Sequence, residues 1–206
     1  MMRNILLVIL LSFIFNGCQT KQDEAIIFKN KLSTEEYNTI NIAVSHFNIY
    51  LKKCYPDLSY DDSYKQFLID FIKDDTKKGF FTTNTEKKIN NNILNNTDVF
   101  KKIKEVNNSY VNPFKGRDKV FDEFYPNLYI LNTESLFFKI LEKNSTSNVR
   151  GYLNLLKKNK EYYSDDYTNY FLLNIDQIDY KYNATKLIIM FNFYYNISIN
   201  NYKMHH

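Results

Sequence analysis

Glycine is scarce in this chain, and its scarcity limits the folds that the chain can adopt. Of 206 residues, 4 are Gly and 3 are Pro. Phosphate-binding loops, dinucleotide-binding fingerprints and β-solenoid repeats need residues that tolerate positive φ or a close approach of the backbone, which Gly does without strain. The composition therefore excludes these folds and the cofactor sites that are built on them.

The first strong helix signal follows Ser33. Ser33 and Glu36 form a capping-box pattern, in which the Ser side chain accepts from the amide three residues on and the Glu reaches back. The apolar residues after them are spaced by three or four, as one face of a helix requires: Tyr37, Ile40, Val44, Phe47 and Leu51. Because Pro cannot continue a helix, we expect this helix to end before Pro56.

Further segments repeat the helical spacing. The pattern predicts helices near 60–72, 136–141, 149–156 and 167–178, a weak helix within 82–97 and a short one over 98–106. Pro113 and Gly116 predict a loop over 107–118. Nothing in the pattern requires two domains, so we expect residues 32–204 to form one mainly helical domain.

The C-terminal segment fits two patterns. Leu187, Met190, Phe191, Tyr194 and Ile197 have helical spacing, whereas residues 191–199 also alternate as a half-buried strand does. The run is long and uninterrupted and Asn183 is a good cap, which favours a helix over a hairpin of 178–182 with 187–199. We predict an all-α, single-domain irregular bundle of about 6–8 helices, with an α+β fold ending in that β-hairpin as the alternative.

The first residues are typical of an export signal. Arg3 precedes an apolar run from Ile5 to Leu11, which is shorter than the roughly 20 residues that span a bilayer. Gly17 and Cys18 follow shortly after this run. The arrangement resembles the bacterial lipobox, although Phe15 and Asn16 stand where that motif usually has Leu and a small residue.

The lipobox resemblance implies a lipoprotein of the cell envelope. Residues 1–17 would be the signal peptide, cleaved between Gly17 and Cys18, and residues 18–31 a lipidated tether whose palmitate-like chains insert in the membrane. Gln19, in place of Asp, implies outer-membrane sorting, on the periplasmic face or the surface. The run Lys21 to Glu24 is similar to the export signal of some Bacteroidota lipoproteins, which the chain also resembles in composition and size.

Paired acids are the main candidates for catalysis. They occur at Asp61–Asp62, Asp74–Asp75 and Asp165–Asp166, with Glu35–Glu36 beside the first cap. Acids with separated pKa values can act as general acid and base, but adjacent residues point in different directions, and acids at helix starts complement the helix dipole. We therefore expect capping roles and no enzymatic activity, and we keep a site of buried carboxylates as a weaker hypothesis.

Other chemistry has little support in the sequence. Cys54 has His46 eight residues upstream, about 12 Å away along one helix, so we expect a buried Cys at a helix end rather than a nucleophile. No motif indicates a metal or another cofactor, because His205 and His206 lie at the extreme C-terminus. With 24 Lys, 3 Arg and a net charge of +4, we expect solvated basic helix faces and no nucleic-acid partner.

Tyrosine is abundant, and one group could form a binding surface. The densest group comprises Tyr162, Tyr163, Tyr167 and Tyr170. Tyr offers an apolar face and a hydroxyl, so it is common at interfaces, but the same residues would also suit half-buried helix surfaces. We expect a non-catalytic binding or interaction module with a protein partner in the envelope. The alternative is an inhibitor or immunity lipoprotein that neutralises a toxin or lytic enzyme.

Overall fold

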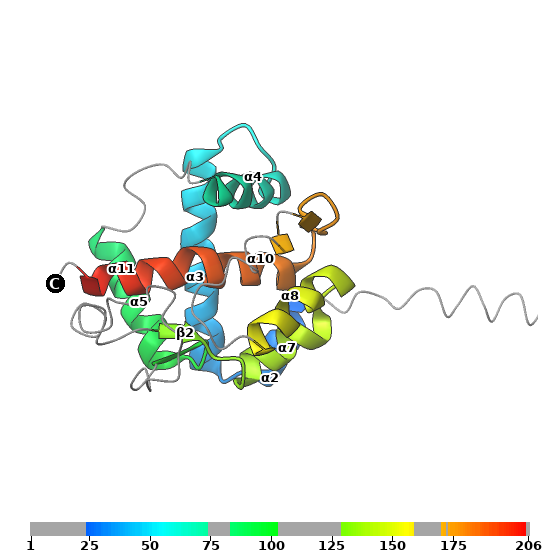
Figure 1. Cartoon of the computed structure of the whole chain (residues 1–206). Coiled ribbons are helices and arrows are strands. Elements are labelled where there is room, and N and C mark those ends of the chain that lie inside the picture. The colour runs from blue at the N-terminus through cyan, green and yellow to red at the C-terminus, as the bar shows by residue number, and fades with distance from the viewer. Residues whose placement is uncertain (1–23, 74–82, 103–128, 159–169, 172, 205–206) are drawn as a thin grey trace, which may run out of the picture.

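The computed structural model describes residues 24–73, 83–102, 129–158, 170–171 and 173–204 (Figure 1). Of these residues, 75% are helical, and the described strands form one two-stranded antiparallel sheet. The predicted mainly helical bundle is thus confirmed. No helix in the described ranges is long and apolar enough to cross a membrane.

The N-terminal half is helical, and Ser33, Ser59 and Thr83 cap the starts of three of its described helices. The described helices of this half are α2 (Glu24–Lys31), α3 (Thr34–Cys54), α4 (Tyr60–Ile72) and α5 (Asn84–Asn96), and the three caps belong to α3, α4 and α5. The Ser33 hydroxyl accepts from the Glu36 amide at 3.1 Å, which confirms the predicted cap of α3. Thr83 and Glu86 form a complete capping box on α5, the segment in which the apolar stripe predicts only a weak helix.

A small sheet precedes the next helix pair. Strands β1 (Phe100–Lys102) and β2 (Tyr129–Leu131) pair antiparallel, and α7 (Leu136–Asn144) and α8 (Ser147–Lys158) follow. The predicted short helix over 98–106 is wrong at 100–102, because Phe100 pairs with Leu131 and both side chains are buried there. Tertiary pairing outweighs the weak helical spacing. The predicted loop over 107–118 lies outside the described residues.

The C-terminal segment is one continuous helix. It comprises α10 (Asn183–Ile189), the π-helical segment η1 (Met190–Tyr195) and α11 (Asn196–Met204). The helix prediction is confirmed, and the alternative hairpin of 178–182 with 187–199 does not form. Asn183 is the first helical residue rather than the cap, and Tyr182 precedes it without a side-chain cap bond.

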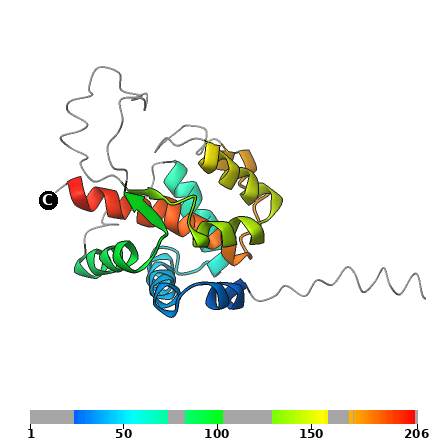
Figure 2. The same cartoon turned by 90° about the horizontal axis from the view of Figure 1, so that it is seen from below.

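This C-terminal helix is buried on nearly every side. Between 184 and 200, every side chain is buried except the half-buried Lys186, Asn192 and Ile197. The helix crosses α3, contacts α4, α2 and α7 through α10, and contacts α5 and β2 through α11 (Figures 1 and 2). A helix that buries apolar residues on nearly all sides belongs at the centre of a fold, and its apolar residues therefore also match the alternation of a strand.

Successive aromatic side chains of the π-helical segment reach different neighbours. The Asn196 amide donates to the Phe191 carbonyl, five residues back, so this turn is wider than an α-turn. Ring contacts then extend in several directions: Phe191 to Phe137 at 5.2 Å, Phe193 to Phe71 at 5.2 Å and to Phe171 at 5.1 Å, and Tyr194 to Phe47 at 4.8 Å. Edge-to-face and tilted pairs at these separations add to the area that they bury.

The expected tether is partly folded. Residues 24–31 form α2, and Phe28 is buried with its ring 5.6 Å from Phe137 of α7. Apolar burial at Phe28 and Leu32 attaches α2 to the domain. Residues 24–31 therefore belong to the folded domain, which was expected to begin at residue 32.

Candidate functional site

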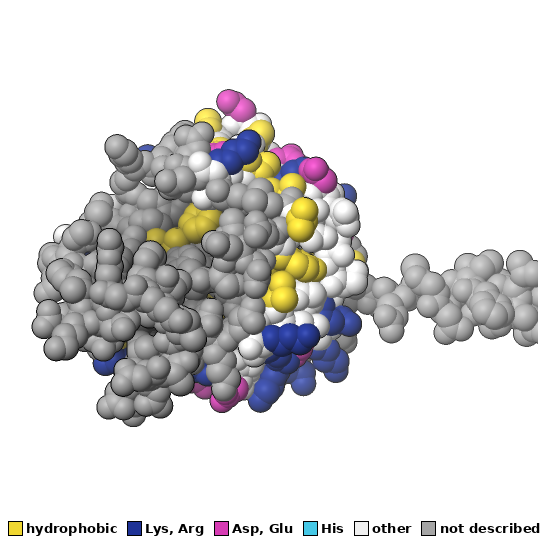
Figure 3. All heavy atoms as spheres, viewed as in Figure 1, with side chains coloured by type: hydrophobic (Ala, Val, Ile, Leu, Met, Phe, Trp, Pro, Cys, Tyr) yellow, Lys and Arg dark blue, Asp and Glu magenta, His cyan; other side chains and the backbone are white. Residues whose placement is uncertain are grey.

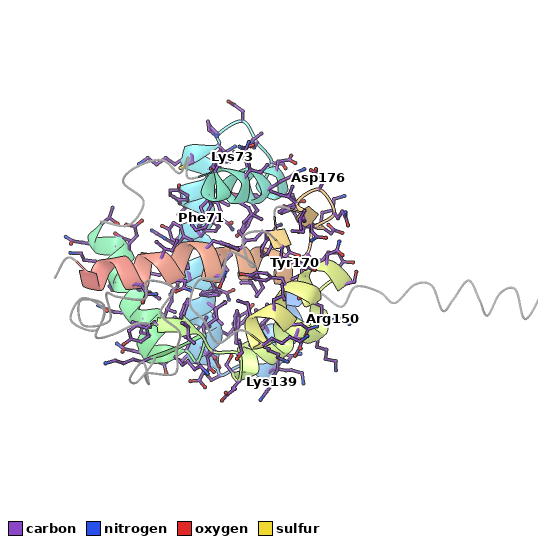
Figure 4. The ribbon with its side chains drawn as sticks, viewed as in Figure 1. Phe71, Lys73, Lys139, Arg150, Tyr170 and Asp176 are labelled. Carbon is purple, nitrogen blue, oxygen red and sulfur yellow. The ribbon has the colours of Figure 1, made fainter. Side chains whose placement is uncertain are left out.

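Most of the residues that the sequence proposes for function lie outside the described ranges. These are Gly17, Cys18, Tyr162, Tyr163 and Tyr167. Tyr170 is described, and it lies half-buried beside α8 (Figure 4). Its hydroxyl donates to the Asn148 carbonyl, and its ring lies 6.1 Å from that of Tyr152. Tyr170 therefore helps to attach the segment before α10 to α8.

Gly151 allows this close approach of Tyr170. A Cβ at Gly151 would overlap the Tyr170 hydroxyl and lie 3.0 Å from Cζ of the same ring. Gly151 is in the interior of α8, where Gly is ordinarily unfavourable by about 1 kcal/mol relative to Ala. The contact with Tyr170 gives a packing reason for Gly at this position.

Glu86 is the most deeply buried carboxylate of the described residues, with 5% of its surface exposed. The Tyr194 hydroxyl donates to Oε1 at 2.9 Å, and the Thr83 amide donates to Oε2 at 2.8 Å. The Thr83 hydroxyl lies 3.1 Å from the same Oε2. Both carboxylate oxygens thus accept hydrogen bonds, as a buried carboxylate requires, and these bonds join α5 to the C-terminal helix.

His46 lies on α3 next to this group. The Tyr195 hydroxyl donates to the Ala43 carbonyl at 2.9 Å, and His46 Nδ1 lies 3.2 Å from the same hydroxyl oxygen. A hydroxyl has one proton, so this geometry assigns the donor role to His46 Nδ1–H. Burial lowers the pKa of His46, and the negative charge of Glu86 opposes this shift.

Burial also raises the pKa values of Tyr194 and Tyr195. Both hydroxyls therefore stay protonated at neutral pH and act as donors. His46, Glu86 and the two tyrosines contain the residue types of an acid–base site, but their bonds run from helix to helix. The arrangement links α3, α5 and the C-terminal helix, and we interpret it as structural.

Two amide side chains extend the same polar layer. Asn90 of α5 donates to Ser198 at 2.8 Å. Asn200 accepts from the Tyr129 amide and donates to the Tyr129 carbonyl, both at 2.9 Å, so it binds the backbone of β2 as a neighbouring strand would. Sequence reasoning missed this layer, and the signal that could have found it is the run of polar residues inside an otherwise apolar helix.

The paired acids within the described residues lie at helix starts and form short-range contacts. Asp62 Oδ2 lies 2.6 Å from the Ser59 hydroxyl at the start of α4, and Asp61 forms an ion pair with Lys186 at 2.6 Å. Acids in the first turns of α3 and α4 confirm the expectation that these pairs complement helix starts. The pairs Asp74–Asp75 and Asp165–Asp166 lie outside the described residues.

Cys54 is the last residue of α3, as expected at a helix end, and it is half-buried rather than fully buried. His46, the residue considered as a partner for Cys54, contacts Tyr195 on the C-terminal helix.

Within the described ranges, no group of three or more His, Cys, Asp or Glu side chains could hold a metal ion.

The surface over α7 and α8 is basic. Figure 3 shows Lys and Arg side chains gathered where Figure 1 places these helices. Residues 134–158 carry five cationic side chains against two carboxylates. The pattern of lysines in the sequence predicts solvated faces, but that these two helices form one surface depends on tertiary packing.

No protein-family model matches the chain, and no curated protein and no solved structure matches it either.

The contact between Gly151 and Tyr170 predicts an unusual effect of Gly151→Ala. The propensity gain of about 1 kcal/mol should be outweighed by overpacking, so we expect the free energy of unfolding to fall by about 1–3 kcal/mol. Urea unfolding followed by circular dichroism measures this change. Asn154→Ala, at an exposed position of α8, is the control and should not lower stability. Gly151→Ala with unchanged or higher stability would contradict the contact.

The lowered pKa of His46 predicts a loss of stability in acid. In the unfolded chain the pKa of His46 is near 6.5, and in the folded protein it is lower, so protonation of His46 favours the unfolded chain. The stability that comes from the neutral His46 is therefore fully present above pH 6.5 and is lost as the pH falls toward the folded pKa. We expect His46→Asn, which keeps a side-chain N–H donor, to have a smaller pH slope of unfolding free energy below pH 6.5 than wild type. Replacing His205 and His206 by Ala is the control and should preserve the wild-type slope. Equal slopes for wild type and His46→Asn would show that His46 is not responsible.

Proposed function

We propose that the protein is a lipid-anchored, non-catalytic binding module of the bacterial outer membrane. The observation that carries the non-catalytic part is the use of the buried titratable side chains. Glu86, Tyr194 and Tyr195 all bond to other helices or caps within the core. A catalytic acid or base must be within hydrogen-bond reach of a substrate proton, so groups committed to the core favour binding over catalysis.

The lipid anchor is supported by the sequence and by the position of α2 in the chain. Gly17 and Cys18 follow an apolar run of signal-peptide length. Five residues lie between Cys18 and Glu24 of α2, and the six steps between these two Cα atoms span about 20 Å when fully extended. Two or three acyl chains on Cys18 would hold the domain stably at the membrane, since one chain binds only marginally.

Metabolic labelling with palmitate tests the anchor. The full-length protein should incorporate label, and Cys18→Ala should lose it, because acylation requires the Cys18 thiol. Cys54→Ala is the matched control and should keep the label, since it removes the other Cys of the chain. Label retained by Cys18→Ala would contradict a lipid anchor at this residue.

Affinity purification tests the binding role and the tyrosine group. The tagged full-length protein is cross-linked in intact envelopes, and we expect a specific partner whose recovery falls strongly in Tyr162→Ser/Tyr163→Ser. Tyr60→Ser, at a 55% exposed position of α4, is the control and should recover the partner normally. A toxin or lytic enzyme as the partner would favour the inhibitor alternative. Equal recovery by all variants would contradict the assignment of the tyrosines.

A further inference from the structure

We propose that the exposed basic face of α7 and α8 docks on the anionic phospholipid surface of the membrane that holds the anchor. The face is defined by Lys139 and Lys143 of α7 and by Arg150 and Lys157 of α8. The proposal rests on the lipid anchor of the proposed function. It adds a second membrane contact, and with it a fixed orientation of the domain.

The cationic residues form a stripe on each helix. On α7, Lys139 and Lys143 are exposed and four residues apart, so they share one face, while Phe137 and Phe138 are buried. On α8, Arg150 and Lys157 are exposed and seven residues apart, again on one face, while Tyr152 and Leu153 are buried. Each helix thus presents an apolar side to the core and a basic side to solvent.

The two stripes belong to one surface because the helices are tied together across it. Lys157 of α8 pairs with Glu142 of α7 at 2.5 Å, and its ammonium lies 5.8 Å from the centre of the Phe138 ring. Arg150 donates to the Ser145 carbonyl in the turn between the helices at 3.1 Å. Figure 4 shows Lys139 and Arg150 on the outer side of this pair.

Few carboxylates in the α7–α8 helix pair balance the positive charge of the two stripes. Glu142 and Glu134 are the carboxylates of residues 134–158, and each has a lysine partner: Glu142 pairs with Lys157, and Glu134 with Lys101 of β1 at 3.6 Å. Lys139, Lys143 and Arg150 therefore give the face a positive potential. Anionic headgroups attract such clusters at distances within about 10 Å at moderate ionic strength.

An exposed apolar side chain lies beside the lysines. Leu136 is 47% exposed and lies three residues before Lys139 and seven before Lys143, so the three side chains share one face of α7. Amphipathic helices at a membrane interface combine such features, with Leu entering the headgroup boundary and lysines binding anionic lipid. This pairing favours a lipid surface as the occupant.

The anchor would keep the whole domain near the bilayer. Phe28 of α2 packs on Phe137 of α7, so α2 lies against the buried side of the helix whose opposite side carries Lys139 and Lys143. Because the chain from Cys18 to Glu24 spans at most about 20 Å, acyl chains on Cys18 would keep the domain within reach of the bilayer, and the charge of the exposed basic face would turn that face to the anionic headgroups.

Lysine acetylation footprinting on vesicles tests the proposal. The full-length lipoprotein, purified in detergent, is reconstituted into vesicles of phosphatidylcholine alone or of equal parts phosphatidylcholine and phosphatidylglycerol, and is labelled with acetic anhydride. We expect Lys139 and Lys143 to be labelled at least about fivefold more slowly on the anionic vesicles. One lysine near an anionic surface strengthens membrane binding by about this factor. High salt should remove the difference. Lys53 and Lys73, exposed at the ends of α3 and α4, are the internal controls and should be labelled equally on both.

A variant pair separates this face from net charge. In Lys139→Glu/Lys143→Glu we expect the lipid-dependent protection of Lys157 to disappear. Lys53→Glu/Lys73→Glu changes the net charge by the same amount and should keep that protection. Circular dichroism of both variants confirms that they are folded.

The outcomes distinguish the two proposals. Equal labelling of Lys139 on both vesicles, with Cys18 acylated by mass analysis, would overturn the docking face and leave the anchor intact. An unmodified Cys18 in the envelope-purified protein would overturn the anchor and the docking proposal that rests on it. Protection that appears only when envelope proteins are added would assign the face to an acidic protein partner and overturn the lipid proposal.

Discussion

The burial of the C-terminal helix is the constraint on which the rest of the structure depends. Its residues 184–200 are almost all buried, and the other helices and β2 pack around it. Phe191, Phe193 and Tyr194 reach different partners because they lie in the π-helical turn. The apolar surfaces of α3, α4 and α7 would face water without this helix, so the hydrophobic gain of the fold comes largely from covering it.

A helix buried on all sides can slide or rotate unless polar contacts define its register. Tyr194 bonds to Glu86, Tyr195 to the Ala43 carbonyl, and Asn200 to the backbone of Tyr129. Each bond satisfies a group that would be costly to bury alone, and shifting the helix by one residue would break several of them. This polar layer therefore positions α3, α5 and β2 relative to the central helix.

The buried titratable side chains and the exposed cationic side chains lie in different parts of the domain. The side chains with catalytic potential hold the core together, whereas the surface of α7 and α8 keeps its cationic residues exposed. Phe28 of α2 packs on Phe137, on the buried side of α7. The buried side of α7 thus packs on α2 and the core, and its opposite side carries the basic residues of the proposed membrane contact.

Local signals in the sequence determined the helical class, the start of α3 at its Ser33 cap and the end of that helix before Pro56, because caps and prolines act through neighbouring backbone groups. The tyrosine group and the lipobox remain sequence-based proposals. Tertiary structure alone decided that Phe100 lies in a strand, that 24–31 fold onto the domain, and that Glu86 meets Tyr194. These outcomes join residues far apart in the chain, and hydrophobic spacing carries no record of which distant partner a side chain will meet.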